Sequence, residues 1–206
     1  MTNQRKLQLF IIVITNAIPL VGVSLWQWNA FQIIFLYWLE SFIVGIYAVF
    51  ELGDLVDSGA IEFDNSILVF SFLYFPGLIF YFFWISKILG GGEASESFEI
   101  LRPYALQTAL CALSFFYSHG LRYQSFEKHL PNSYLTGAKF FLSPFLRFFM
   151  VQTLLVTSAL WIHHRHAAVI YFTVTCAVKA AVDFGFHWWH EAHIPPVVKD
   201  REFFGL

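Results

Sequence analysis

The sequence predicts an all-α polytopic transmembrane helix bundle with about six spans and both termini in the cytoplasm. Of the 206 residues, 58% are hydrophobic and only 13% are charged, whereas an ordinary soluble domain has about 25% charged residues. The mean hydropathy is +0.62 and 26 residues are phenylalanine, which suits helices that face lipid. We expect residues 1–206 to form a single integral-membrane domain.

The first two spans come from one uncharged run between Leu7 and Leu39. About 20 apolar residues cross a bilayer once, so this run holds one span and much of a second. Polar residues and interfacial tryptophans meet at Trp26–Asn29, where we place the break. The predicted spans are 7–25 and 30–52.

Two further spans follow an acidic loop. Asp64–Ser66 forms a good helix start, which predicts a span over 67–89. The segment 90–99 begins with three glycines, and we expect it to be a flexible connection. Pro103 is favourable in the first turn of a helix and predicts a span over 103–120.

The last two apolar runs predict spans over 144–162 and 167–189. The connection before them, 121–143, is the longest in the chain. Its part 134–146 is either a short amphipathic helix on the cytoplasmic interface or an ordinary loop, because a proline and a glycine interrupt this region.

Lysine and arginine residues in the short loops set the orientation, since they accumulate on the cytoplasmic side. With the N-terminus inside, most of them fall on that side, and the chain is expected to be a multi-pass protein of the cell membrane. The first apolar run is too long for a signal peptide and lacks a small-residue cleavage site, so we expect an uncleaved span. The cytoplasmic set is Arg5, Lys6, Arg122, Lys128, Lys139, Arg147, Lys199 and Arg201, and the outer set is Lys87, Arg102 and Arg165.

The span 167–189 carries ionisable residues along one side. Lys179, Asp183, His187 and His190 are separated by four, four and three residues, which places them on one helical stripe. Ionisable groups at membrane depth are costly and normally face the protein interior, a water-filled cavity or each other. This stripe is therefore expected to face inward.

A polar intramembrane site is predicted where this stripe meets other spans. Asn16, Glu40 and Lys179 each lie near the centre of their spans, so we expect them at matched depth with Glu40 and Lys179 paired. Asp183, one turn from Lys179, completes the site and is also the competing partner for the lysine. In the alternative interpretation these charges only fix the helix register.

A second set of residues suggests a metal site or a proton relay. His119, Asp183, His187 and His190 lie closer to the cytoplasmic side, at the level of Gln152. Imidazole and carboxylate suit a divalent metal ion such as zinc or iron, and histidine also titrates near neutral pH. Alternatively, the later histidines only meet the lipid headgroups, as the adjacent tryptophans do.

Other patterns in the sequence give weaker support for a functional site. His190–His193 (HEAH) is one residue short of a zinc-binding HExxH, and His163–His166 (HHRH) holds an arginine that opposes a cation. Cys111 and Cys176 both fall mid-span, which indicates small core residues rather than a disulfide framework. The formal charge of −2 argues against a nucleic-acid-binding role, which needs a basic surface.

The chain resembles a known group of sequences in several blocks, which together cover most of its length. It is similar to a bacterial and archaeal family of small multi-spanning membrane proteins that is catalogued as a domain of unknown function. The similar blocks are Asn16–Gly22 (NAIPLVG), Leu36–Glu40 (LYWLE), Ser118–His119, 144–147, and Lys179, Asp183 and His187.

This resemblance implies a membrane fold with polar positions at Glu40, His119, Lys179, Asp183 and His187, and it implies no activity. The family pattern has a histidine where this chain has a glutamine in the fifth span, and that departure weakens a multi-histidine metal site.

Three functions fit these residues. The favoured one is a small-solute or ion transporter with the Glu40 site, because intramembrane ionisable residues commonly mark substrate or ion pathways. The second is a metal-dependent membrane-embedded enzyme with water activated on the metal. The third is a non-catalytic accessory subunit. The expected partners are the lipid bilayer and either further copies of the chain or a larger membrane complex.

Overall fold

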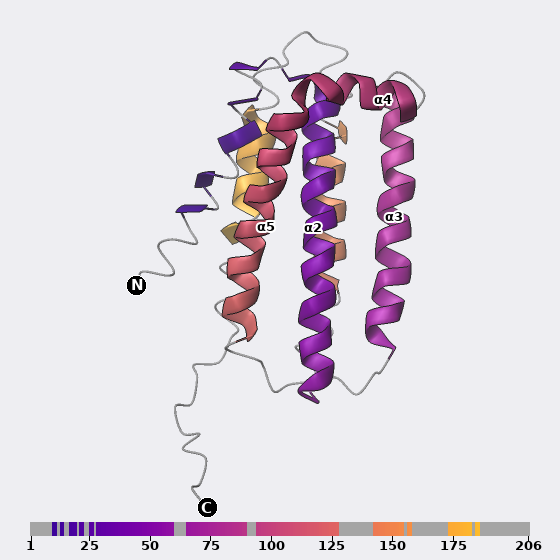
Figure 1. Ribbon diagram of the computed structural model, residues 1–206, viewed down its shortest axis with the longest axis vertical. Helices are drawn as coiled ribbons and strands as arrows, with labels where there is room; N and C mark the ends of the chain where they lie inside the picture. Colours follow the sequence, from indigo (N-terminus) through magenta and orange to yellow (C-terminus); the bar gives the residue numbers. More distant parts are fainter. Residues whose placement is uncertain are drawn as a thin grey trace, which may run out of the picture.

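The computed structural model is almost entirely helical in the part of the chain that it describes (Figure 1). It describes residues 28–59, 65–89, 94–127, 142–154 and 173–182, with positions 10, 11, 13, 14, 17–19, 21, 22, 25, 26, 156, 157, 184 and 185. The labelled elements are α2 (Ala30–Asp57), α3 (Ser66–Leu89), α4 (Ala94–Leu101), the 3-10 turn η1 (Arg102–Tyr104) and α5 (Ala105–Glu127). Two further helical segments cover 142–154 and Thr173–Val182.

Helix α2 begins where the polar break was predicted, because Asn29 caps it. The Asn29 side chain accepts a hydrogen bond from the Gln32 backbone N–H at 3.0 Å, and the Gln32 side chain accepts one from the Asn29 N–H at 2.7 Å. This capping box satisfies two backbone donors that a helix start otherwise leaves open. At the other end Gly59 adopts a positive φ of 72°, which is favourable for glycine after a helix.

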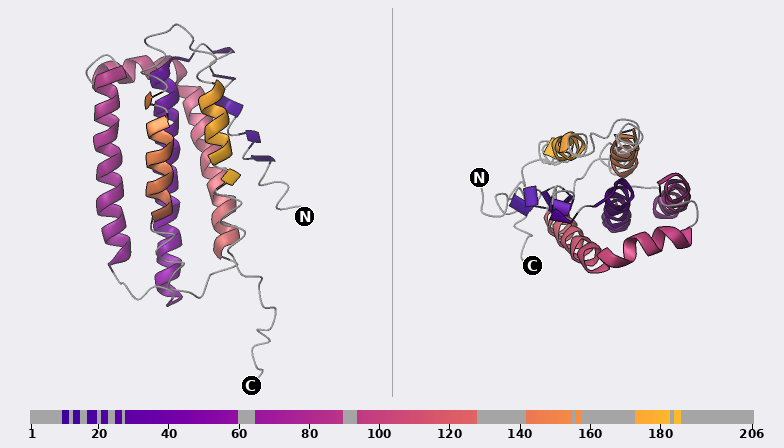
Figure 2. Two further views of the ribbon diagram at one scale, coloured as in Figure 1. Left: turned by 180° about the vertical axis from the view of Figure 1, so that it is seen from behind. Right: turned by 90° about the horizontal axis from the view of Figure 1, so that it is seen from above.

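Helix α2 lies at the centre of the bundle (Figures 1 and 2). The end-on view shows α3 and α5 on two sides of it, and the segments 142–154 and Thr173–Val182 on a third. The short helix α4 crosses one end of the bundle between α3 and α5 (Figure 1). A side chain near the middle of α2 can therefore meet residues from several helices at once.

The contacts fix the direction of each helix relative to α2. The Trp38 indole donates to the Leu78 carbonyl and the Tyr74 hydroxyl donates to the Ser41 carbonyl, so α3 runs antiparallel. The neighbours of α2 along α5 and along Thr173–Val182 advance in the same direction as α2, so these two run parallel to it. Alternation of this kind is expected for consecutive spans joined by short loops.

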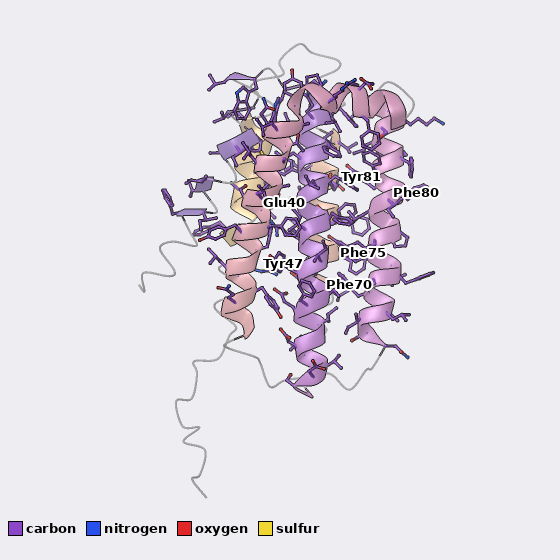
Figure 3. All side chains as sticks on the ribbon, viewed as in Figure 1. Glu40, Tyr47, Phe70, Phe75, Phe80 and Tyr81 are labelled. Atoms are coloured by element: carbon purple, nitrogen blue, oxygen red, sulfur yellow. The ribbon has the colours of Figure 1, made fainter. Side chains whose placement is uncertain are left out.

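Aromatic side chains fill the space between α2 and α3. Phe70, Phe75 and Tyr81 extend from α3 on its inner side, as Figure 3 shows. A Cβ at Gly45 would overlap the Tyr74 ring, so glycine is needed there for α2 and α3 to approach. Two clusters of buried residues result, one on each half of α2.

Large apolar side chains also cover the outside of the bundle. Phe80 on the outer side of α3 is 75% exposed (Figure 3), and Leu113 on α5 and Phe149 are exposed by more than half. Helices α2 and α3 are each long and apolar enough to cross a membrane. In the apolar stretch of α3 only 28% of the residues are buried within the protein.

The helix boundaries agree with the sequence analysis in part. Helix α2 continues five residues past the predicted end, and α3 matches its predicted range almost residue for residue. The segment 90–99 was expected to be a flexible connection, but α4 occupies its second half. The helix α5 continues to Glu127, seven residues past the predicted end of the span near residue 120.

Several predicted elements lie wholly or partly outside the described residues. They are the break at 27, the connection 128–141, and parts of the spans 7–25, 144–162 and 167–189. Within the described portions of these spans, the backbone is helical. The end of the expected interfacial segment 134–146 belongs to the helix 142–154.

Candidate functional site: a buried carboxylate shared by four helices

Glu40 lies near the middle of α2, buried in the bundle. Figure 3 shows it, with Tyr47, between α2 and α5. The carboxylate side chain is 8% exposed, so it is withdrawn from solvent on every side. An ionised carboxylate in such a place is stable only if opposite charges and hydrogen-bond donors surround it.

Basic side chains from three other helical segments reach the Glu40 carboxylate. The Arg147 guanidinium, from 142–154, donates to Glu40 Oε1 at 2.8 Å. The Lys179 ammonium lies 2.8 Å from Glu40 Oε2 and donates to Oε1 at 3.0 Å. Both carboxylate oxygens are therefore engaged by cations.

His119 from α5 completes the ring around Glu40. Its Nε2 lies 3.8 Å from Glu40 Oε1, and its side chain is 9% exposed. That separation is longer than a hydrogen bond. A small movement of either helix would form the bond or leave room for another atom between them.

The Tyr37 ring lies beside the Lys179 ammonium. The Lys179 Nζ lies 4.9 Å from the centre of the Tyr37 ring, in the range of a cation–π interaction. The Tyr37 hydroxyl in turn donates to Cys176 Sγ, one turn before the lysine, at 3.5 Å. The Lys179 side chain is only 2% exposed, so its amine depends on these protein groups for stabilisation.

The expected contact between Glu40 and Lys179 is present, although its role as a functional site stays a prediction. The other members of the predicted sites, Asn16, Asp183, His187 and His190, lie outside the described residues.

His119 is the described member of the predicted metal site, and it faces Glu40. Within the ranges that the structure describes, no group of three or more histidine, cysteine, aspartate or glutamate residues is arranged to hold a metal ion. The metal site with Asp183, His187 and His190 therefore stays a prediction.

Arg147 is the site residue that the sequence analysis missed. It was counted with the loop charges, but it lies inside the helix 142–154 and its side chain is 15% exposed. The described part of this helix already includes Leu142, and from its helical backbone the Arg147 side chain reaches Glu40 on α2. The sequence did contain a signal for this contact, because an arginine within an apolar span needs a partner of opposite charge.

A second ion pair joins α2 and α5 nearer the end of the bundle. The Arg122 guanidinium donates to Glu51 Oε1 at 2.8 Å. Glu51 is 3% exposed, whereas Arg122 is 30% exposed. Arg122 was also counted as a loop charge, but its backbone belongs to α5, which extends past it.

Polar groups next to the Glu40 site are incompletely bonded. Gln152 is 3% exposed, and its Nε2 reaches the Ser41 hydroxyl over a long 3.5 Å. The Gln152 carbonyl oxygen and the Tyr81 hydroxyl are both buried without a hydrogen-bond partner among the described residues. Leaving such an atom unbonded costs about 1–3 kcal/mol.

These contacts define a class of protein, a helical bundle with an apolar exterior and a charged centre. The chain belongs to the family of unknown function DUF6498, whose model matches residues 1–199. This agrees with the resemblance to a domain of unknown function. No curated protein and no solved structure matches the chain.

Proposed function

We propose that this protein is a multi-pass integral membrane protein that carries a small solute or an ion past the Glu40 site. In this proposal the chain crosses the prokaryotic inner membrane about six times, with both termini in the cytoplasm. The observation that carries the transport proposal is the convergence of Arg147, Lys179 and His119 on one buried carboxylate.

The distribution of polar and apolar side chains supports the membrane location. Glu40 and Lys179 are buried at the centre, while Phe72, Phe80 and Leu106 are each exposed by more than 70% on the outside. A water-soluble protein normally has the opposite arrangement. An exterior with many large apolar side chains is stable in lipid and favours aggregation in water.

The loop charges still support the orientation after the charges that lie on α-helices are left out. This removes Arg122 and Arg147 from the cytoplasmic set (8 − 2 = 6) and Lys87, on α3, from the outer set (3 − 1 = 2). Six basic residues against two support the proposal that both termini lie in the cytoplasm.

The Glu40 site supports transport because its partners come from different helices. Arg147 lies on 142–154, Lys179 on Thr173–Val182 and His119 on α5. A solute or ion that competes for Glu40 weakens one of these links and favours another. Binding would then shift the relative positions of the helices, as a ligand does when it prefers one of two conformations.

Flux measurements on reconstituted protein test the proposal. Proteoliposomes would be loaded with fluorescent indicators for protons, sodium, potassium or chloride, and a gradient of each ion would be imposed. We expect flux of one of them above that of empty liposomes, and we expect Glu40→Gln to reduce it at least tenfold. Glutamine keeps the shape of the side chain but removes its charge, so the two basic partners lose their counter-ion.

The matched control is Glu99→Gln, a carboxylate at the surface on α4 that is 72% exposed. This variant should transport as the unmodified protein does. Equal flux with Glu40→Gln and with the unmodified protein would contradict the transport role of Glu40, and so would the absence of both ion flux and small-solute entry.

A further inference from the structure

Tyr81 and Gln152 each bury a polar atom that the protein leaves unbonded. The Tyr81 hydroxyl and the Gln152 side-chain carbonyl have no hydrogen-bond partner in the part of the chain that the structure describes. Gln152 is 97% buried, and Tyr81 belongs to the layer of aromatic side chains between α2 and α3. Buried polar atoms of this kind are uncommon, and each one needs an explanation.

Both residues adjoin the helix 142–154, Tyr81 from α3 and Gln152 as one of its own residues. The Tyr81 ring packs against Phe148 with their centres 5.4 Å apart. Gln152 follows Phe148 by four residues, so it lies one turn further along the same side of that helix. Its amide nitrogen reaches Ser41, the residue after Glu40. This region is thus continuous with the Glu40 site.

The two unbonded atoms have complementary chemistry. The tyrosine hydroxyl can donate a hydrogen bond, and the glutamine carbonyl can accept one. A ligand that satisfies both must accept from Tyr81 and donate to Gln152. Hydroxyl groups, primary amides and urea do this with neighbouring atoms.

We propose that Tyr81 and Gln152 form a subsite for the hydrogen-bonding group of a small neutral solute, such as an alcohol or an amide. This inference rests on the proposed transport function and names the class of substrate. Neither side chain carries a charge at this subsite, so a neutral ligand gains both hydrogen bonds without the desolvation cost of an ion. The charged Glu40 centre lies beside the subsite and supplies the element that responds to the bound solute.

Solute uptake by proteoliposomes tests this subsite. Light scattering in a stopped-flow instrument would follow the swelling of vesicles in gradients of glycerol, urea or acetamide, with an impermeant sucrose gradient to measure water alone. We expect at least one of the three solutes to enter faster than it enters empty liposomes. Tyr81→Phe and Gln152→Met should each slow this entry about five- to tenfold, the effect of one lost hydrogen bond.

Two exposed residues of α5 provide matched controls. Tyr117→Phe and Gln124→Met make the same chemical changes at the surface of the bundle. They should leave solute entry unchanged.

The stability of the variants separates a ligand subsite from a structural role. Removing an unbonded buried polar atom relieves its desolvation cost, so Tyr81→Phe should raise the Tm in solute-free detergent by about 2 °C. Gln152→Met relieves the same kind of cost but also removes the long hydrogen bond to Ser41, so its Tm should stay unchanged. Variants with a lower Tm and unchanged solute entry would overturn the proposal.

The transport result also distinguishes this inference from the proposed function. Ion flux that depends on Glu40, without entry of any of the three solutes, would refute the neutral subsite and leave the proposed function standing. Faster water movement alone would identify the pair as a water site and likewise refute it. Absence of both ion flux and solute entry would refute the two proposals together.

Discussion

Helix α2 carries two buried carboxylates, and their surroundings differ. Glu40 in the middle of the helix is reached by basic groups from three other helical segments. Glu51, eleven residues further on, pairs with Arg122, which is 30% exposed. Eleven residues are close to three helical turns, so both carboxylates lie on nearly the same side of α2.

The difference shows how depth determines the number of partners that a charge needs. Near the end of the bundle, water can solvate the outer part of Arg122, and one strong hydrogen bond suffices for the pair. At the centre, neither Glu40 nor Lys179 reaches water, so the protein must supply every stabilising contact. A site built from groups on four helical segments is also one that helix movement can rearrange.

Glu40→Leu tests the central site and should have the largest effect on stability. Leucine fills much of the volume but leaves Arg147 and Lys179 buried without this carboxylate. Breaking a buried ionic group in this way costs about 3–5 kcal/mol. Unfolding in mixed micelles of dodecylmaltoside and sodium dodecyl sulfate would measure the change in the free energy of unfolding.

A loss below about 1 kcal/mol, the value typical of exposed pairs, would contradict a dry central site. It would mean that water reaches Arg147 and Lys179 once the carboxylate is gone.

Glu51→Leu tests the second ion pair and should have a smaller effect. Arg122 can turn toward solvent when it loses its partner, so we expect a loss of about 1–3 kcal/mol, the contribution of one charged hydrogen bond. The double variant Glu51→Leu with Arg122→Met should recover most of this loss, because it removes both charges together. The same unfolding experiment measures both.

Equal losses for Glu40→Leu and Glu51→Leu would remove the distinction between the centre and the end of the bundle. A double variant less stable than Glu51→Leu alone would mean that Arg122 has a stabilising role besides this pair.

The apolar pattern predicts the long helices well because the hydrophobicity of their side chains determines where these helices lie. Runs of 20 or more apolar residues gave α3 almost to its ends, and the polar residues at Asn29 located the start of α2. The pattern fails for α4 and for the end of α5. Both segments are helical but more polar. Hydropathy identifies segments that are stable in an apolar medium, and it does not identify helical backbone as such.

The sequence predicted the candidate site only where the free-energy cost of burying an unpaired charge indicates its partner. A glutamate and a lysine near the centres of two parallel spans are expected to meet, and Glu40 and Lys179 do. Arg147 and Arg122 were assigned to loops because they lie near the ends of apolar runs, and the sequence does not reveal that they reach back into the bundle. The unbonded atoms of Tyr81 and Gln152 have no sequence signal, since both residue types usually find partners.

The surface pair of Glu99 and Arg102 extends the comparison to full solvent exposure. These side chains lie 3.5 Å apart at the junction of α4 and η1, and they are 72% and 79% exposed. Water solvates both charges whether or not they touch, so Glu99→Gln should leave the free energy of unfolding unchanged within the error of the micelle experiment. The three carboxylates would then form a series in which the loss falls as water gains access. A substantial loss at Glu99 would break that series and would mean that the lipid headgroups, or a second chain, shield α4 from water.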